Sequence, residues 1–187
     1  MQLAIEMDPI GIIEKYYDPE SRAHYFLINH STAVTEKALR IASRVKHLSP
    51  DLAFIREAAM LHDIGIFLTD EPKIGCHGDK AYICHGYLGR ELIEREGFPR
   101  HALVCERHVG VGISLWEIEG RNLSLPKRDM LPVTTEEQII CFADKFFSKD
   151  TDSLLKEKPL ERIRSGIAAF GADKLRRFDE WLKLFGD

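Results

Sequence analysis

The chain has 187 residues, of which 44% are hydrophobic and 30% are charged, and its formal net charge is −4. This balance is typical of one globular domain. Residues 1–187 are therefore expected to form a single domain, with a core large enough to be stable without disulfides or a structural metal. The acidic balance excludes broad nucleic-acid binding, which requires a basic face, and no stable nucleic-acid complex is expected.

The sequence shows neither a cysteine framework nor a leader or membrane-spanning segment. The four cysteines form no C-x-x-C pair and no regular framework, so neither a zinc ribbon nor a disulfide scaffold is predicted. No basic-plus-apolar leader and no run of about 18 apolar residues is present. We therefore expect a cytoplasmic protein without a membrane partner. The sequence leaves the oligomeric state open.

Helix signals dominate the chain from end to end. Asp8-Pro9 is typical of a helix start, and Thr134 with Glu137 is typical of a capping box. The apolar spacing and these signals predict helices over residues 9–17, a segment with His30 that ends near 46, 51–65, 81–96, 100–108, 134–149, 160–170 and 173–185. Residues 69–80 and 119–134 are predicted to be irregular, and 109–112 to form a turn. No run alternates with a period of two, so the predicted class is all-α.

Five of these predicted helices each place a metal-seeking group on their apolar face. The groups are His30, His62 with Asp63, His85, His108 and Asp144. A buried ionisable group is costly unless it is paired or coordinates a metal. One such histidine alone is more often a hydrogen-bonded core residue, but together these side chains would compete for few partners. The pattern therefore predicts a metal centre inside the bundle.

The order of these residues resembles a family signature. The segment Leu61-His62-Asp63-Ile64-Gly65, preceded by His30 and followed by Asp144, resembles the H…HD…D signature of the HD superfamily of metal-dependent phosphohydrolases. The resemblance runs from about residue 27 to about residue 148. It implies an HD-domain helical bundle with the metal site in its core, on which the N-terminal and C-terminal helices pack.

The two further histidines, His85 and His108, resemble those of the two-metal branch of the superfamily. The nearest pattern is that of bacterial HD hydrolases acting on nucleotides, including the symmetrical diadenosine tetraphosphate hydrolases. The HD-GYP cyclic dinucleotide phosphodiesterases are more distant. They carry a lysine where this chain has Ile66, and a pair of histidines where it has His108 alone.

The resemblance implies two divalent transition metals. One ion would be held by His30, His62, Asp63 and Asp144, and the other by His85, His108 and the second oxygen of Asp63. Nitrogen and oxygen ligands without thiolate suit iron, which we expect first, or manganese, zinc, cobalt or nickel. Such a pair would bridge a water and activate it as hydroxide for attack on phosphorus, with His62 and Asp63 as the central catalytic residues.

The expected substrate is a small phosphorylated molecule, nucleotide-like in character. Cations near the predicted centre are candidates to bind it: Lys145 beside Asp144, and Lys80, Lys127 and Arg128 in or beside the irregular stretches. His101 lies two turns before His108, about 10 Å along the helix and too far to share its metal, so it is a candidate for substrate contact instead. The last two predicted helices are expected to be purely structural.

Three functions are compatible with these residues. The leading one is hydrolysis of a phosphoester or phosphoanhydride. The second is oxidation of a substrate by O₂, because mixed-valent di-iron HD oxygenases have a similar ligand set. The third is a non-catalytic, ligand-binding HD protein, which would be expected to have lost its metal residues. Phosphate release and oxygen consumption distinguish the first two.

Overall fold

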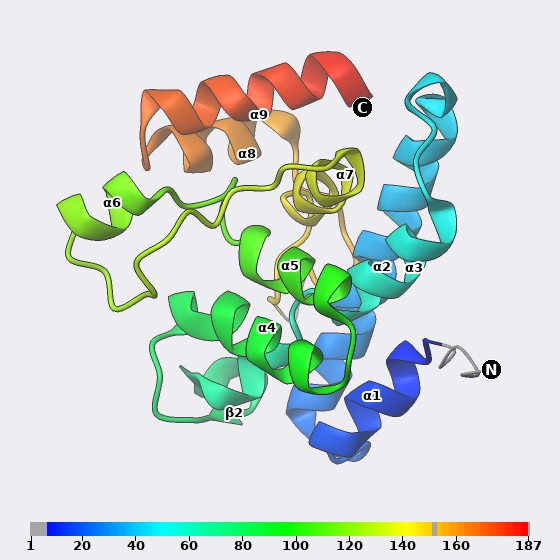
Figure 1. Cartoon of the computed structure of the whole chain (residues 1–187), viewed down its shortest axis with the longest axis vertical. Helices are drawn as coiled ribbons and strands as arrows, with labels where there is room; N and C mark the ends of the chain where they lie inside the picture. The colour runs from blue at the N-terminus through cyan, green and yellow to red at the C-terminus, as the bar shows by residue number, and fades with distance from the viewer. Residues whose placement is uncertain (1–6, 151–152, 187) are drawn as a thin grey trace.

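The computed structural model describes residues 7–150 and 153–186, and almost all of its regular structure is helical (Figure 1). The predicted all-α class is therefore confirmed. Within these residues the α-helices are α1 (Pro9–Tyr16), α2 (Arg22–Arg44), α3 (Leu52–Leu61), α4 (His85–Arg95), α5 (Pro99–Arg107), α6 (Leu115–Gly120), α7 (Thr135–Asp144), α8 (Leu160–Ala168) and α9 (Ala172–Phe185). Two strands, β1 (Asp70–Glu71) and β2 (Cys76–His77), form one short antiparallel pair.

Side-chain caps set the starts of several helices. Asp8 accepts a hydrogen bond of 3.0 Å from the backbone N–H of Gly11 at the start of α1. Thr134 and Glu137 form the predicted capping box at the start of α7, each side chain accepting from the other residue's backbone N–H. Both caps satisfy amides that the first helical turn leaves without a partner. The start of α7 matters most, because this helix carries Asp144 at its other end.

Three helices end earlier than the sequence predicts. Helix α2 ends at Arg44, α3 at Leu61 and α7 at Asp144, where the expected ends were residues 46, 65 and 149. After α3 the chain tightens into a 3₁₀ turn, η2 (Ile64–Leu68). After α7 the Phe146 carbonyl accepts a hydrogen bond of 2.7 Å from the backbone N–H of Lys158 instead of a helical partner. These early ends leave His62, Asp63 and Asp144 at helix termini.

The two stretches predicted to be irregular contain some regular structure. Residues 69–80 include β1, β2 and the 3₁₀ turn η3 (Pro72–Ile74). Of residues 119–134, the first two belong to the end of α6, and the rest form the long connection to α7 that crosses the molecule in Figure 1. This connection is fixed by two backbone hydrogen bonds between Ile113 and Met130, of 3.0 and 2.8 Å. The second half of the connection is therefore attached to the segment just before α6.

The helices pack around α2, α3 and α7. Helices α4 and α5 lie against η2 and α3, and α8 and α9 cover the far side of α7 (Figure 1). The core on that side is aromatic: Phe142 of α7 and Phe146, just after this helix, meet Phe178 and Phe185 of α9 within one buried cluster. Helix α7 is therefore held between the bundle and the C-terminal helices, which fixes the position of Asp144.

No helix within residues 7–150 and 153–186 is both long enough and apolar enough to cross a membrane.

Candidate metal centre

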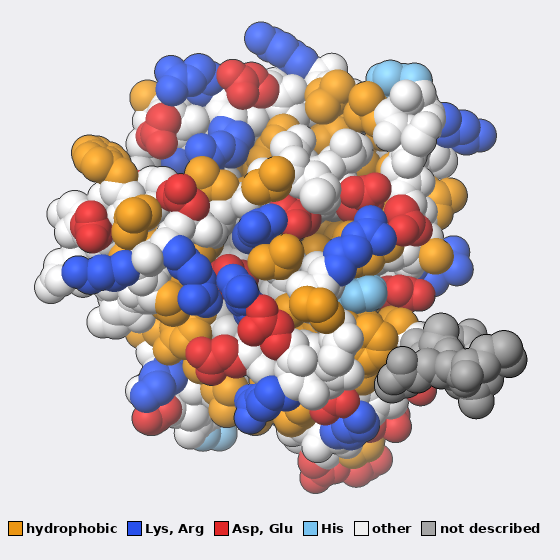
Figure 2. Space-filling view, in the orientation of Figure 1, with side chains coloured by type: hydrophobic (Ala, Val, Ile, Leu, Met, Phe, Trp, Pro, Cys, Tyr) orange, Lys and Arg blue, Asp and Glu red, His pale blue; other side chains and the backbone are white. Residues whose placement is uncertain are grey.

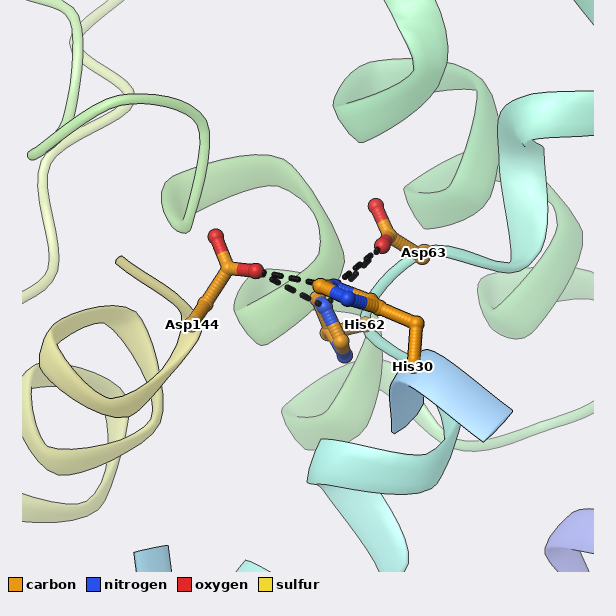
Figure 3. A group of neighbouring side chains, drawn as sticks. All are labelled: His30, His62, Asp63 and Asp144. Atoms are coloured by element: carbon orange, nitrogen blue, oxygen red, sulfur yellow. Dashed lines mark hydrogen bonds and ion pairs between the residues drawn. The ribbon is translucent and has the colours of Figure 1, made fainter. Parts of the chain in front are cut away.

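Four of the predicted ligands meet at the centre of the bundle. His30 comes from the middle of α2, His62 and Asp63 follow the end of α3, and Asp144 is the last residue of α7 (Figure 3). The His30 Nε2 atom lies 2.9 Å from Asp144 Oδ1 and 3.2 Å from Asp63 Oδ2, and His62 Nε2 lies 3.1 Å from the same Asp63 oxygen. One ligand atom from each of the four residues lies within 4.8 Å of the others, which is close enough to hold one metal ion.

The other oxygen of Asp63 faces a second group. His85 Nε2 and His108 Nε2 each lie 3.3 Å from Asp63 Oδ1, and 3.0 Å from one another. These three residues form a second set of possible metal ligands. Asp63 therefore belongs to both groups, and each of its oxygens is directed at one of them. This is the arrangement expected of a carboxylate that bridges two ions.

Backbone carbonyls orient three of the imidazoles. The Nδ1–H groups of His62, His85 and His108 donate to the carbonyls of Ala59, Tyr82 and Cys105, each three residues earlier, at 2.6, 2.6 and 2.7 Å. In the neutral imidazole the other nitrogen is then unprotonated. Each Nε2 lone pair points into the centre, and a hydrogen bond of this kind is the usual support for a metal-binding histidine.

The orientation of these imidazoles tests whether a metal would fit. Two unprotonated Nε2 atoms of His85 and His108 face each other at 3.0 Å, which is repulsive unless a cation lies between them. Two nitrogens bound to one ion at ~2.1 Å lie about 3 Å apart when they occupy adjacent coordination positions. Both Asp63 oxygens and His62 Nε2 are buried without a well-directed hydrogen bond among the described residues. The donor set therefore fits metal ions.

Glycines bring the second group to the first. A Cβ atom on Gly65 would lie 2.2 Å from the backbone oxygen of His85, so only glycine lets η2 approach the start of α4 this closely. A Cβ atom on Gly86 would lie 2.9 Å from the Cys105 carbonyl oxygen, at the contact between α4 and α5. The glycine of the His-Asp-Ile-Gly segment thus has a physical role, because it allows His85 to reach Asp63.

Two lysines neutralise the buried carboxylates. Lys149 Nζ lies 2.5 Å from Asp63 Oδ2, and Lys145 Nζ lies 2.7 Å from Asp144 Oδ2. Burial opposes ionisation of both aspartates, but these lysines and the neighbouring imidazoles hold the pKa of each carboxyl well below its usual range. Lys145 is predicted because it directly follows Asp144 in the sequence. Lys149 has no predicted ligand beside it in the sequence, so it is not predicted.

The imidazoles divide into two electrostatic environments. Burial alone would lower the pKa of His62, but Asp63 and Asp144 raise it to about 9. Burial lowers the pKa of His85 to about 3, and Asp63 only partly opposes this effect. Burial also lowers the pKa of His108. The His85 and His108 pair therefore stays neutral at physiological pH, as metal coordination requires.

A cavity of about 490 Å³ opens onto the Asp63, His85 and His108 group. We call it the apolar cavity, because its walls include Ile83, Val109, Val111, Ile113, Leu123, Ile167 and Phe170. Two of these residues belong to the end of α8 and the turn after it, and Lys174 of α9 also lines the cavity. The expectation that the last two helices are purely structural is therefore wrong, since they form one wall of the site.

The other candidates for substrate contact lie away from this cavity. The exposed Lys80 Nζ pairs with Asp79 at 3.1 Å, and His101 Nε2 pairs with Glu57 at 2.9 Å. Lys127 is exposed, with Glu119 at 3.9 Å, and Arg128 pairs with the buried Glu106 at 2.6 Å. None of the four lines the apolar cavity, whereas Lys145 does. Arg128 is held in a structural ion pair and is not available to bind phosphate in this conformation.

Surface charge is mixed on the face that carries α4, α5 and α6. Figure 2 shows acidic and basic side chains interspersed over this face, with no continuous basic area. The basic groups that matter to the site are instead inside it, beside the aspartates. This distribution suits a small anionic ligand better than a long polyanion on this face.

A helical bundle with a buried centre of histidines and aspartates, divided into two groups by one carboxylate, defines the class of protein. The model of the HD domain family matches residues 27–148, from just before His30 to just after Asp144. The chain belongs to the HD domain family.

Its curated relatives are archaeal. An uncharacterized protein of Methanocaldococcus jannaschii is 37% identical over 121 residues, which are 63% of this chain and 64% of that protein. A tRNA (cytidine(56)-2'-O)-methyltransferase of Thermoplasma volcanium is 32% identical over 82% of this chain but 41% of its own length. The enzyme of the same name from Picrophilus torridus is 31% identical over 70% of this chain and 34% of its own length. The chain thus spans less than two thirds of each relative, and no solved structure matches it.

Proposed function

We propose that this chain is a metal-dependent phosphohydrolase with two divalent transition metals, acting on a small, nucleotide-like phosphoester or phosphoanhydride. The observation that carries the proposal is the position of Asp63, whose two oxygens face two separate groups of histidines. When bound, two ions held by these residues would activate water for attack and offset the charge on the phosphoryl oxygens. Iron is the metal expected first, with manganese, zinc, cobalt or nickel as alternatives.

The chain's own residues would position the substrate for this reaction. Lys145 and Lys149 line the apolar cavity beside the aspartates, where a cation would stabilise a bound phosphoryl group. Burial raises the pKa of the nearby Tyr82 to about 12, although Lys149 opposes this effect. Tyr82 therefore keeps its proton at neutral pH and is able to donate a hydrogen bond. The walls of the cavity would bind the organic part of the substrate and limit the access of bulk water.

The reaction has a simple balance. The water oxygen forms a bond to phosphorus, and the bond from phosphorus to the leaving oxygen breaks. The leaving oxygen takes up a proton and the product is inorganic phosphate or a phosphate ester. No side-chain nucleophile is needed, and the four cysteines are not suited to that role: all are buried, and burial raises the pKa of each thiol, for Cys76 to about 11.

The names of the archaeal relatives do not transfer a methyltransferase activity to this chain. The matching region is only 41% and 34% of the two methyltransferases. Most of each enzyme therefore lies outside the part shared with this chain.

Phosphate release from a panel of phosphomonoesters, nucleotides and phosphoanhydrides tests the proposal. The protein should release phosphate in the presence of iron or manganese, lose this activity with a chelator, and regain it when the metal is restored. Oxygen consumption is measured in the same samples. Metal-dependent oxygen consumption without phosphate release would replace the hydrolase with the di-iron oxygenase. Ligand binding with neither reaction would indicate the non-catalytic alternative.

A further inference from the structure

A second cavity also borders the metal ligands. It has a volume of about 370 Å³ and shares Tyr82, Asp144, Lys145 and Lys149 with the apolar cavity. Where the apolar cavity reaches His85 and His108, this one reaches His30 of the other ligand group. Each cavity therefore reaches a different ligand group, and the four shared residues belong to the walls of both.

The lining of the second cavity is cationic. We call it the lysine cavity, because four lysines line it: Lys73, Lys145, Lys149 and Lys158. Among the described residues, Glu71 is the only carboxylate besides Asp144 in its lining. In the described part of the chain, no carboxylate lies within ion-pair distance of Lys158 or Lys73, whereas Lys145 and Lys149 are paired. Two positive charges are thus left over beside the reacting centre.

The apolar cavity has no such excess. Its Lys174 Nζ lies 2.7 Å from Glu117 Oε1 and 2.7 Å from the Gly112 carbonyl oxygen, so this cation is already satisfied. Its Arg121 donates to the Phe170 carbonyl at 3.2 Å. The two cavities therefore suit different chemical groups, one apolar and one anionic.

Neighbouring charges make the lysine cavity costly without an anion. Burial lowers the pKa of Lys158 to about 8, and Lys145, Lys149 and Arg162 lower it further, although Asp144 opposes them. A cation whose pKa is lowered by other cations gains most from a nearby anion. A phosphoryl group carries enough negative charge to relieve this repulsion and is a common ligand of lysine.

We infer that the lysine cavity binds a second phosphoryl group of the substrate, with Lys158 as its main contact. This rests on the proposed function and narrows it: the preferred substrate is an organic phosphate with at least two phosphoryl groups, its organic part in the apolar cavity. Phosphomonoesters fill only part of this site. Lys158 is a specificity-determining residue that touches the anion and no metal ligand.

Binding of non-hydrolysable probes tests the inference without relying on turnover. The metal-loaded protein is titrated calorimetrically with the phosphonate analogue of adenosine 5'-monophosphate, in which a methylene group replaces the ester oxygen, and with adenosine 5'-(α,β-methylene)diphosphate, whose bridging carbon resists hydrolysis. The diphosphate analogue should bind at least about tenfold more tightly, the difference expected for one charge-assisted contact. Lys158→Met should remove most of this difference and Lys158→Arg should retain it. The matched control is Lys156→Met, two residues away and exposed, which should change neither affinity.

Three results would overturn the inference. One is equal affinity for the two probes, and another is an equal effect of Lys158→Met and Lys156→Met. The third is that free phosphate strengthens binding of the monophosphate and that Lys158→Met abolishes this effect. The cavity would then bind a separate phosphate ion and not a second phosphoryl group of the substrate. Failure of the proposed function is distinguishable, because a chain that prefers the diphosphate analogue but releases no phosphate from any compound keeps the anion site and loses the hydrolase.

Discussion

Asp63 is fully buried, and its charge is tolerated because the Lys149 ammonium group lies 2.5 Å from its Oδ2 atom. The imidazoles of His30 and His62 lie beside one oxygen, and those of His85 and His108 beside the other. An unpaired carboxylate at this depth would be strongly destabilised. A carboxylate at this position therefore lowers the stability of the fold compared with an apolar residue, as expected for a functional residue.

The second histidine group gives the first prediction. Changing His85 or His108 to alanine should leave the His30, His62, Asp63 and Asp144 group able to hold one ion, while the other ion is lost. Turnover should fall at least about 100-fold, since changes around metal sites that leave the ligands intact already cost 10–100-fold. Metal content by mass spectrometry and initial rates check this. His101→Ala is the control, because His101 pairs with Glu57 outside the centre. Two ions and full rates in both variants would show a one-ion enzyme.

Lys158 gives a prediction on pH. Its pKa of about 8 means that the side chain is mostly charged at pH 7 and mostly neutral at pH 9. Affinity for the diphosphate analogue should therefore weaken as the pH rises through about 8, and the bound anion should shift the midpoint upward. In Lys158→Met this change should be absent. If the variant kept the same pH profile, the effect would belong to another charged group near Lys158. These groups are Glu71, Lys73, Asp144, Lys145 and Lys149 in the cavity lining, and Arg162 beside it.

The sequence predicts the six ligands but few of the other residues of the site. The ligands stand out because each interrupts an apolar helical stripe. Lys149 gives no such signal, because on a helix continued from Asp144 it would lie five residues away, about 140° around the axis. The helix stops at Asp144 instead, and Lys149 reaches Asp63. Lys158 and Phe170 are brought to the site only by tertiary packing, which a periodic pattern does not record.

Helix α7 is the element on which the centre depends most. It holds Asp144 at its end and packs on α2 and, through Phe142, on α9. Phe146, just after the helix, also contacts α9. The boundaries of such elements are predicted less well than their existence. The capping box of Thr134 fixes the start of α7, whereas its end depends on the chain folding back to give the Phe146 carbonyl a partner from Lys158.

The contact between α9 and α7 gives a stability prediction. Phe178 is fully buried against Phe142 and Phe146, so Phe178→Ala should lower the free energy of unfolding by about 3–5 kcal/mol through lost burial and a residual cavity. Chemical denaturation measures this. Phe170→Ala is the matched control, because Phe170 is 61% exposed and should change stability by about 0.5 kcal/mol or less. Equal losses in the two variants would mean that the aromatic cluster does not hold α7 in place.

The whole molecule combines the core matched by the HD family model with a wall that lies outside this match. The HD match ends at residue 148, yet Lys149, Lys158, Ile167, Phe170 and Lys174 all line one of the two cavities. The ligands would therefore set the reaction, and the C-terminal segment would select the substrate. This division explains why the sequence predicts the metal chemistry from a family signature but does not predict the shape of the two cavities.

The number of metal ions per chain in the wild type and in Asp63→Ala is the most direct measurement. Because Asp63 contacts both groups of histidines, the wild type should bind about two ions, and the variant should lose both together with the activity. Asp79→Ala, at an exposed position, should keep two, and circular dichroism verifies that each variant is folded. A wild type that is fully active with one ion, or a folded Asp63→Ala variant that keeps both, would contradict a shared carboxylate at the centre of this site.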